Sequence, residues 1–159
     1  IQALEVFHRR TTSDGVMDDQ EFDAFYSKLV AAIPDPENKR MKEKLLGTCR
    51  YLNELSLGQR LRAIVADLTA SFGHTPPAFS KRNIRKLVDT RNYYTHFSKD
   101  LESKGMKGGG EMYWASRRIV LLLSLLFLQR LGVTAAELTR LLERHQEFSR
   151  LWVTEGEPF

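Results

Sequence analysis

Apolar residues recur at helical spacing along most of the chain, whereas the alternation that marks a β-strand is weak. These apolar stripes predict helices over residues 20–33, 37–55, 57–72, 80–97 and 111–131, with a last helix from residue 134 to the region of Phe148. Residues 1–10 also have the pattern of a helix interior. The sequence therefore predicts an all-α bundle of about six or seven helices.

Capping residues mark where several of these helices begin. A capping box places a small polar residue at the helix start and Glu or Gln three residues later. The sequence has three such pairs: Asp18 with Glu21, Ser56 with Gln59, and Thr134 with Glu137. Residues 98–110 are polar and end in three consecutive glycines, a pattern typical of a mobile connection between helices.

Length and composition narrow the class of protein. The chain has 159 residues, which favours a single domain over residues 1–159, and its hydrophobic fraction of 42% is enough for a core. Cys49 is the only cysteine, which excludes a disulfide scaffold and is typical of a reducing compartment. The longest apolar run, residues 119–128, is shorter than the ~20 residues that a membrane span needs. We therefore expect a cytoplasmic protein that does not cross a membrane.

Positive charge is concentrated in one region of the sequence. Residues 81–118 contain ten Lys or Arg and four Asp or Glu. The rest of the chain contains fourteen Lys or Arg and sixteen Asp or Glu. This asymmetry predicts an anionic partner, with a solvated basic helix face as the alternative.

The helix predicted over residues 80–97 carries a charge where its apolar stripe should continue. Ile84, Leu87 and Val88 define the stripe, and the helical period places position 91 on the same face. Position 91 is an arginine, which is costly to bury unless it is paired or faces a cleft. Because functional sites are where local rules break, we take Arg91 and the polar residues after it as a candidate site.

The spacing of Arg91 and His96 is informative. They are five residues apart, about 140° around a regular helix, so they do not share a face. Asn92 and His96 are four residues apart and do share a face, so Asn92 can hold the His96 ring. Arg91 and His96 can converge if the helix loosens before His96. They can also converge if two chains meet in a dimer that involves residues 80–97.

These residue types suit the cleavage of RNA. An arginine fork binds phosphate, and histidine can take or give a proton near neutral pH. RNA supplies its own nucleophile, the 2′-hydroxyl, so the pair requires no metal. The alternative is a buried structural Arg–His pair. The candidate substrate-binding residues around the pair are Tyr93, Thr95, Lys99 and Arg85.

The sequence predicts neither a metal site nor a cofactor site. Its four histidines include no close pair, and no glycine-rich phosphate loop with its lysine is present.

The segment from Arg91 to His96 resembles the motif of HEPN domains, in which a polar residue follows the arginine and a histidine comes four to six positions after it. Its setting over residues 84–97 is similar to the HEPN helix that carries the motif. Residues 1–10 and 51–57 resemble the ApeA-like subgroup, the C-terminal domains of bacterial proteins implicated in defence against phage. The resemblance covers residues 21–145, and it implies that the chain is the C-terminal part of a longer protein.

The resemblance implies a helical bundle that forms homodimers, with the motifs of two protomers making one metal-independent endoribonuclease site. It implies that Arg91 and His96 are the catalytic pair, that Asn92 is the accompanying polar residue, and that an N-terminal sensor domain lies outside this chain. HEPN toxins that are modified by a partner enzyme carry a tyrosine two residues after the histidine. Because Ser98 occupies that position here, we do not expect that mode. The alternative function is a non-catalytic RNA-binding or protein-interaction module.

Overall fold

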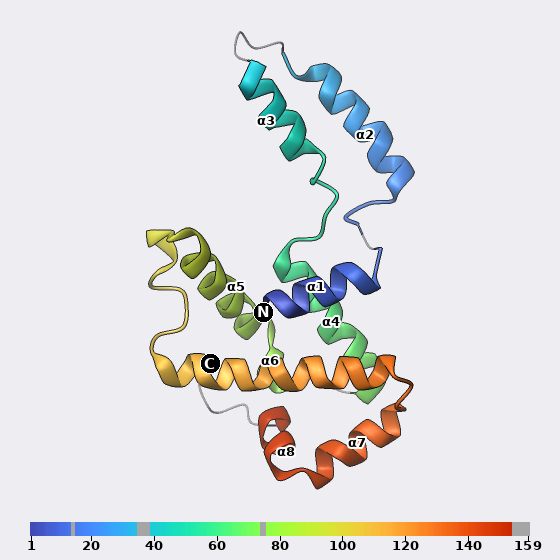
Figure 1. The fold of residues 1–159 in the computed structure, drawn as a ribbon, viewed down its shortest axis with the longest axis vertical. Helices are drawn as coiled ribbons and strands as arrows, with labels where there is room; N and C mark the ends of the chain where they lie inside the picture. The colour runs from blue at the N-terminus through green and yellow to red at the C-terminus, as the bar shows by residue number, and fades with distance from the viewer. Residues whose placement is uncertain (14, 35–38, 74–75, 154–159) are drawn as a thin grey trace. The chain divides into compact units, whose positions relative to one another are not determined.

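The computed structural model describes residues 1–13, 15–34, 39–73 and 76–153 (Figure 1). These residues contain no β-strand, only an isolated bridge between Gly15 and Glu54, so the predicted all-α class is confirmed. They form eight α-helices, one more than the upper end of the prediction: α1 (Gln2–Thr11), α2 (Asp19–Ala32), α3 (Lys39–Cys49), α4 (Leu57–Phe72), α5 (Lys81–His96), α6 (Gly109–Arg130), α7 (Ala135–Arg144) and α8 (Gln146–Val153). Two single-turn 3₁₀ helices, η1 (Pro77–Phe79) and η2 (Lys99–Leu101), lie beside α5 in the sequence.

The chain divides into two compact units. The main unit consists of Ile1–Thr11 and Leu57–Phe159, and the inserted unit is Thr12–Ser56, which contains α2 and α3. The base of the inserted unit is closed by bonds between its two ends: the Val16 amide donates to the Asn53 carbonyl at 2.9 Å, and the Met17 amide donates to the Asn53 side chain at 2.9 Å. That residues 1–159 form a single domain stays a prediction.

The additional helix arises from a break in the last predicted helix. α7 begins with the predicted capping box, in which the Glu137 amide donates to the Thr134 hydroxyl and the Thr134 amide donates to the Glu137 carboxylate. His145 then leaves the helical conformation, with φ −96° and ψ 102°, and α8 begins at the next residue. The apolar stripe continues on both sides of this break, which is why its periodicity predicts one helix.

The core of the main unit is built around α6, the longest helix in the described residues. Buried leucines of α6 pack with apolar side chains of the other helices of the unit. These residues are Leu4, Leu61, Ile64, Leu68, Ile84, Leu87, Leu121, Leu122, Leu125 and Leu138. None of the helices in the described ranges is both long and apolar enough to cross a membrane.

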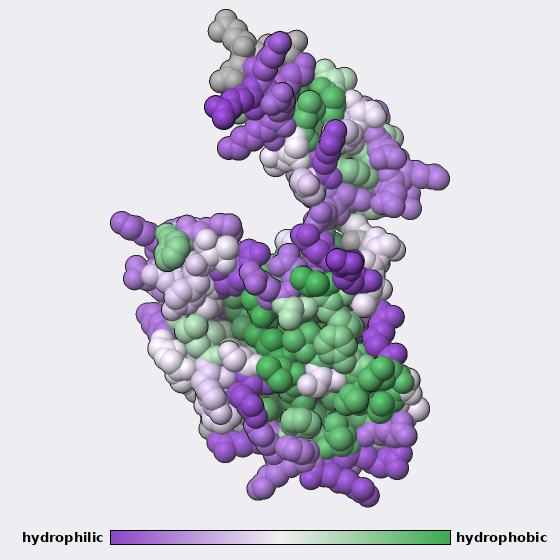
Figure 2. All heavy atoms as spheres, viewed as in Figure 1, coloured by the Kyte–Doolittle hydropathy of each residue, from purple (hydrophilic) through white to green (hydrophobic). Residues whose placement is uncertain are grey.

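α6 is apolar on its outer side as well. Val120 and Phe127 leave 56% and 55% of their surface exposed, and Phe127 packs edge-on against Phe7 of α1. Figure 2 shows apolar side chains gathered over α1 and α6 on this side of the main unit. We call the side of α6 that carries the exposed residues Tyr113, Val120 and Phe127, which are spaced seven residues apart, the α6 face. Exposed apolar side chains grouped in this way are typical of a surface that contacts a partner.

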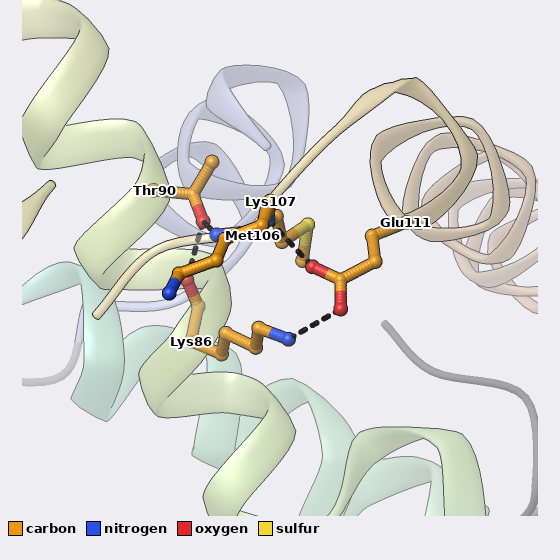
Figure 3. Close-up of polar contacts among 5 residues, drawn as sticks. All are labelled: Lys86, Thr90, Met106, Lys107 and Glu111. Carbon is orange, nitrogen blue, oxygen red and sulfur yellow. Dashed lines mark hydrogen bonds and ion pairs between the residues drawn. The ribbon is translucent and has the colours of Figure 1, made fainter. Parts of the chain in front are cut away.

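α5 carries the predicted motif and remains a regular helix to its end. The Ser80 side chain caps its first turn, and Phe97 ends it in the left-handed conformation, with φ 50°. The connection that follows is held against α5, because the buried Met106 amide donates to the Thr90 hydroxyl at 2.8 Å (Figure 3). The predicted mobile connection is therefore anchored at its middle.

Candidate functional site

Arg91 lies on the inner side of α5, beside a cavity of about 410 Å³. Side chains from α1, α5, α6 and the connection after α5 line this cavity: Ile1, Gln2, Ala3, Leu87, Thr90, Arg91, Tyr94, Thr95, Met106, Met112, Ala115, Ser116 and Ile119. Most of the lining side chains are apolar, and the one that carries a formal charge is Arg91. The cavity thus combines apolar walls with one group that can bind an anion.

The charge on Arg91 is met by two neighbours. Its Nη2 lies 3.5 Å from Oε2 of Glu5 on α1, and its Nη1 donates to Oδ1 of Asn92 at 3.0 Å. The side chains of Arg91 and Glu5 are 25% and 17% exposed, so the ion pair is mostly shielded from water. The Arg91 Nε atom is buried without a hydrogen-bond partner in the described residues. This pairing explains how α5 tolerates a guanidinium on its apolar side.

His96 lies elsewhere on the same helix. It is the last residue of α5 and is exposed, and no hydrogen bond or ion pair joins it to Arg91 in the described part of the chain. Since α5 is helical through His96, the interpretation that the helix loosens before His96 is wrong. The alternative of a buried Arg–His pair is also wrong. The Asn92 oxygen accepts from Arg91, so the expected support of the His96 ring by Asn92 is not observed either.

The four predicted substrate-binding residues are distributed over different surfaces. Thr95 is exposed and lines the Arg91 cavity. Lys99 is exposed in η2, and Arg85 is 82% exposed, with its Nε 4.0 Å from the Asp89 carboxylate. The structure thus brings Thr95 to Arg91, whereas Lys99 and Arg85 do not line its cavity.

Tyr93 contacts the neighbouring Tyr94 ring edge-on, with ring centroids 5.1 Å apart. The nearby Glu102 carboxylate raises the pKa of Tyr93, because a second negative charge beside the phenolate is unfavourable. Tyr93 therefore keeps its proton at neutral pH and remains a hydrogen-bond donor.

Glu5 is a site residue that the sequence pattern does not predict. Its partner Arg91 is more than eighty positions away, and periodicity does not reveal which helices will pack together. The sequence offers one signal, which is that Glu5 is the acidic residue in the first turn of an amphipathic helix.

The site around Arg91 does not have the donor set of a metal centre. Within the ranges that the structure describes, no group of three or more His, Cys, Asp or Glu side chains is arranged to hold a metal ion. Glu5 is the carboxylate that pairs with Arg91, and a single carboxylate beside a guanidinium is not a cation site.

Comparison with known proteins supports the resemblance to HEPN domains. The family model described as Apea-like HEPN matches residues 1–137, which include α5 and the segment from Arg91 to His96. No curated protein and no solved structure matches the chain. Since the family model spans most of the chain, the protein belongs to the Apea-like HEPN family.

Proposed function

We propose that this protein is a metal-independent endoribonuclease of bacterial defence, which cleaves RNA at a composite site formed by two chains. Arg91 and His96 are its catalytic residues, and Asn92 orients the Arg91 guanidinium. Family membership indicates a nuclease or other RNA-related function in defence. The observation that carries the more specific proposal is the geometry of α5, which presents an oriented guanidinium beside a cavity and an exposed imidazole five residues later.

The reaction follows from the chemistry of these groups. The imidazole of one His96 takes the proton of a ribose 2′-hydroxyl, and that oxygen forms a bond to the adjacent phosphorus. The bond from phosphorus to the 5′-oxygen breaks, and the leaving oxygen receives a proton from the His96 of the second chain. Arg91 stabilises the negative charge that develops on the phosphate oxygens. The products are a 2′,3′-cyclic phosphate and a 5′-hydroxyl.

A second chain is part of this proposal because the two side chains diverge in one chain. Members of the HEPN family commonly dimerise and bind RNA. The α6 face offers an exposed apolar surface for a second copy. That surface is next to the site, because Met112, Ser116 and Ile119 of α6 also line the Arg91 cavity. We therefore assign the interface to α6 together with the end of α5, which extends the expectation that residues 80–97 take part.

The proposed function also bears on where the protein acts and on what controls it. Its RNA substrate is found in the cytoplasm, so we propose a cytoplasmic location. An N-terminal sensor domain outside this chain would control when the nuclease acts.

One observation favours the alternative, a non-catalytic RNA-binding or protein-interaction module. Arg91 already has a carboxylate partner in Glu5, and a phosphate must compete with that carboxylate for the guanidinium. In a non-catalytic module, Arg91 can stay paired with Glu5, because no phosphate has to displace the carboxylate.

Incubation of the purified chain with end-labelled single-stranded RNA tests the proposal. Wild type should cut the RNA, His96→Ala should not, and His145→Ala should cut it as wild type does. His145 is a suitable control because it is an exposed histidine at the junction of α7 and α8. RNA binding without cleavage by the wild-type chain would support the module instead, and full activity of His96→Ala would refute the catalytic assignment.

A further inference from the structure

A second pocket lies against α5, away from the Arg91 cavity. Its volume is about 510 Å³, and its walls come from α5, the connection after η2 and the start of α6. The residues that line it are Arg82, Arg85, Lys86, Asp89, Ser103, Lys104, Gly105, Lys107 and Glu111. We call it the basic pocket, because five of these side chains are basic and two are acidic.

The walls of the basic pocket are tied together by hydrogen bonds and an ion pair (Figure 3). The Glu111 carboxylate lies between two partners: Lys86 Nζ is 2.8 Å from one oxygen, and the Lys107 amide donates to the other at 2.7 Å. Burial alone would raise the pKa of Glu111, but the bonds from Lys86 and Lys107 outweigh it and lower that pKa. Glu111 therefore stays ionised and holds the connection and α5 in place.

Close backbone packing completes the wall. Gly105 lies so near to α5 that a Cβ atom there would meet Thr90 Cα and the Thr90 hydroxyl oxygen at 3.3 Å. The Thr90 hydroxyl also accepts from the Met106 amide at 2.8 Å. The segment from Gly105 to Lys107 thus separates the two cavities, with Met106 lining one and Lys107 the other.

The composition of the basic pocket indicates the class of ligand. Glu111 neutralises Lys86, and Asp89 lies 4.0 Å from Arg85, which leaves a surplus of three positive charges among the lining side chains. The lining contains neither an aromatic ring nor an aliphatic side chain on which a nucleobase could stack. A surplus of cationic side chains without aromatic rings suits the phosphate backbone more than the bases.

The position of the pocket on α5 connects it to His96. Arg85 and His96 are eleven residues apart, which at ~100° per residue places them within about 20° of each other around the helix. They are separated by ~16 Å along the axis. Arg91 projects from a different side of the helix, ~140° from His96, toward α1 and α6. The basic pocket and the exposed imidazole therefore share one face of α5.

We propose that the basic pocket binds a backbone phosphate of the RNA strand, on one side of the phosphate that is cleaved. This inference rests on the proposed function for the identity of the polymer. The pocket adds affinity without base recognition, so it predicts tight but sequence-tolerant binding along the His96 face of α5.

The test measures RNA affinity in a chain that does not cleave. A labelled single-stranded RNA of about twelve nucleotides is titrated with His96→Ala, and fluorescence anisotropy is recorded over a range of KCl concentrations. Arg82→Gln with Lys104→Gln removes two charges of the pocket, and Arg140→Gln with Arg144→Gln removes two charges of α7 as the matched control. The pocket variant should bind roughly tenfold more weakly at low salt, and its slope of log affinity against log salt should fall by about 0.7 for each RNA phosphate that the pocket no longer neutralises. The control should bind as the parent does.

Equal losses of affinity for the two double variants would overturn the proposal, because they would reflect net charge rather than the pocket. Inorganic phosphate or a nucleoside monophosphate at millimolar concentration can be added as a competitor. If these small molecules displace the RNA and bind the pocket as tightly as the RNA does, the proposal is overturned in favour of a free phosphate ligand. The assay does not require cleavage, so its result is separate from the fate of the proposed function. A wild-type chain that never cuts RNA, combined with a loss of affinity confined to the pocket variant, would refute the nuclease and support the pocket.

Discussion

The Arg91 guanidinium lies 3.5 Å from the Glu5 carboxylate, so the charge on the inner side of α5 is met by α1. This ion pair links the first helix of the chain to the helix that carries the motif. We expect it to stabilise the main unit, and it sets the state from which Arg91 must bind a phosphate.

Replacement of Glu5 tests the stabilising part of this link. Glu5→Gln removes the carboxylate charge that Arg91 faces at 3.5 Å and Arg9 at 3.4 Å, and it should lower the free energy of unfolding by about 1–2 kcal/mol. Tryptophan fluorescence during denaturant unfolding reports on the main unit, because Trp114 and Trp152 both belong to it. The exposed Glu143→Gln on α7 is the matched control and should stay within ~0.5 kcal/mol of wild type. An equal effect of the two substitutions would show that the pair contributes nothing specific.

Arg91 and His96 should respond differently to substitution. His96→Ala should remove cleavage and change stability by less than ~0.5 kcal/mol, because His96 is exposed at the helix end. Arg91→Lys keeps the charge but loses the fork that contacts Glu5 and Asn92, so cleavage should fall at least ~tenfold while the fold persists. Denaturant unfolding and cleavage rates of the same preparations give both quantities. Wild-type rates for Arg91→Lys would contradict the assigned role of the guanidinium.

Cleavage should not depend on a metal ion. The groups assigned to the reaction are a guanidinium and an imidazole, which supply charge stabilisation and proton transfer. Activity should persist in excess EDTA, the products should carry 2′,3′-cyclic phosphate ends, and the DNA analogue should remain intact because it lacks the 2′-hydroxyl. Activity that disappears with EDTA and returns with magnesium would refute this mechanism.

The Thr90 hydroxyl should be important for the wall between the two cavities. Thr90→Val leaves the buried Met106 amide without its acceptor and should destabilise the main unit by about 1–2 kcal/mol. Thr90→Ser retains the hydroxyl and is the control. Hydrogen exchange at the Met106 amide should accelerate in Thr90→Val and stay near wild type in Thr90→Ser. Unchanged exchange in the valine variant would mean that other interactions hold the connection.

The α6 face should mediate dimerisation. Val120→Glu places a charge on the exposed apolar surface and should shift the protein to a monomer in sedimentation velocity, with loss of cleavage and little change in stability. Ala136→Glu adds the same charge at an exposed position of α7 and should leave the dimer intact. A strict monomer in the wild-type chain at high micromolar concentration would count against the composite site.

Local sequence signals predicted much of the fold. The stripe formed by Ile84, Leu87 and Val88 located α5, and the same period placed Arg91 on its inner side, where the structure has it. The capping box at Thr134 located the start of α7. These features depend on residues close in sequence, so their physical cause is visible in the sequence itself.

Features that depend on long-range packing were not predictable in the same way. The Glu5–Arg91 pair requires α1 to pack near α5, and the basic pocket requires Lys104 and Lys107 to return to α5 through the anchor at Thr90. The basic charges of this region were visible in the composition, but their arrangement in one pocket was not. The divergence of Arg91 and His96, by contrast, follows from helical geometry, and the regularity of α5 preserves it.

The closed base of the inserted unit bears on how the main unit folds. α1 and α4 are separated in the sequence by the whole of Thr12–Ser56, so their association must close a long loop of chain. The bonds from Val16 and Met17 to Asn53 join the two ends of that segment and shorten the effective loop to its few flanking residues. By the logarithmic cost of loop closure this saves ~1–2 kcal/mol when α1 docks. If the insertion forms first, α1 and α4 can associate as if a short connection joined them, and only the stretch from α4 to α5 then separates the helix that supplies Glu5 from the helix that carries Arg91.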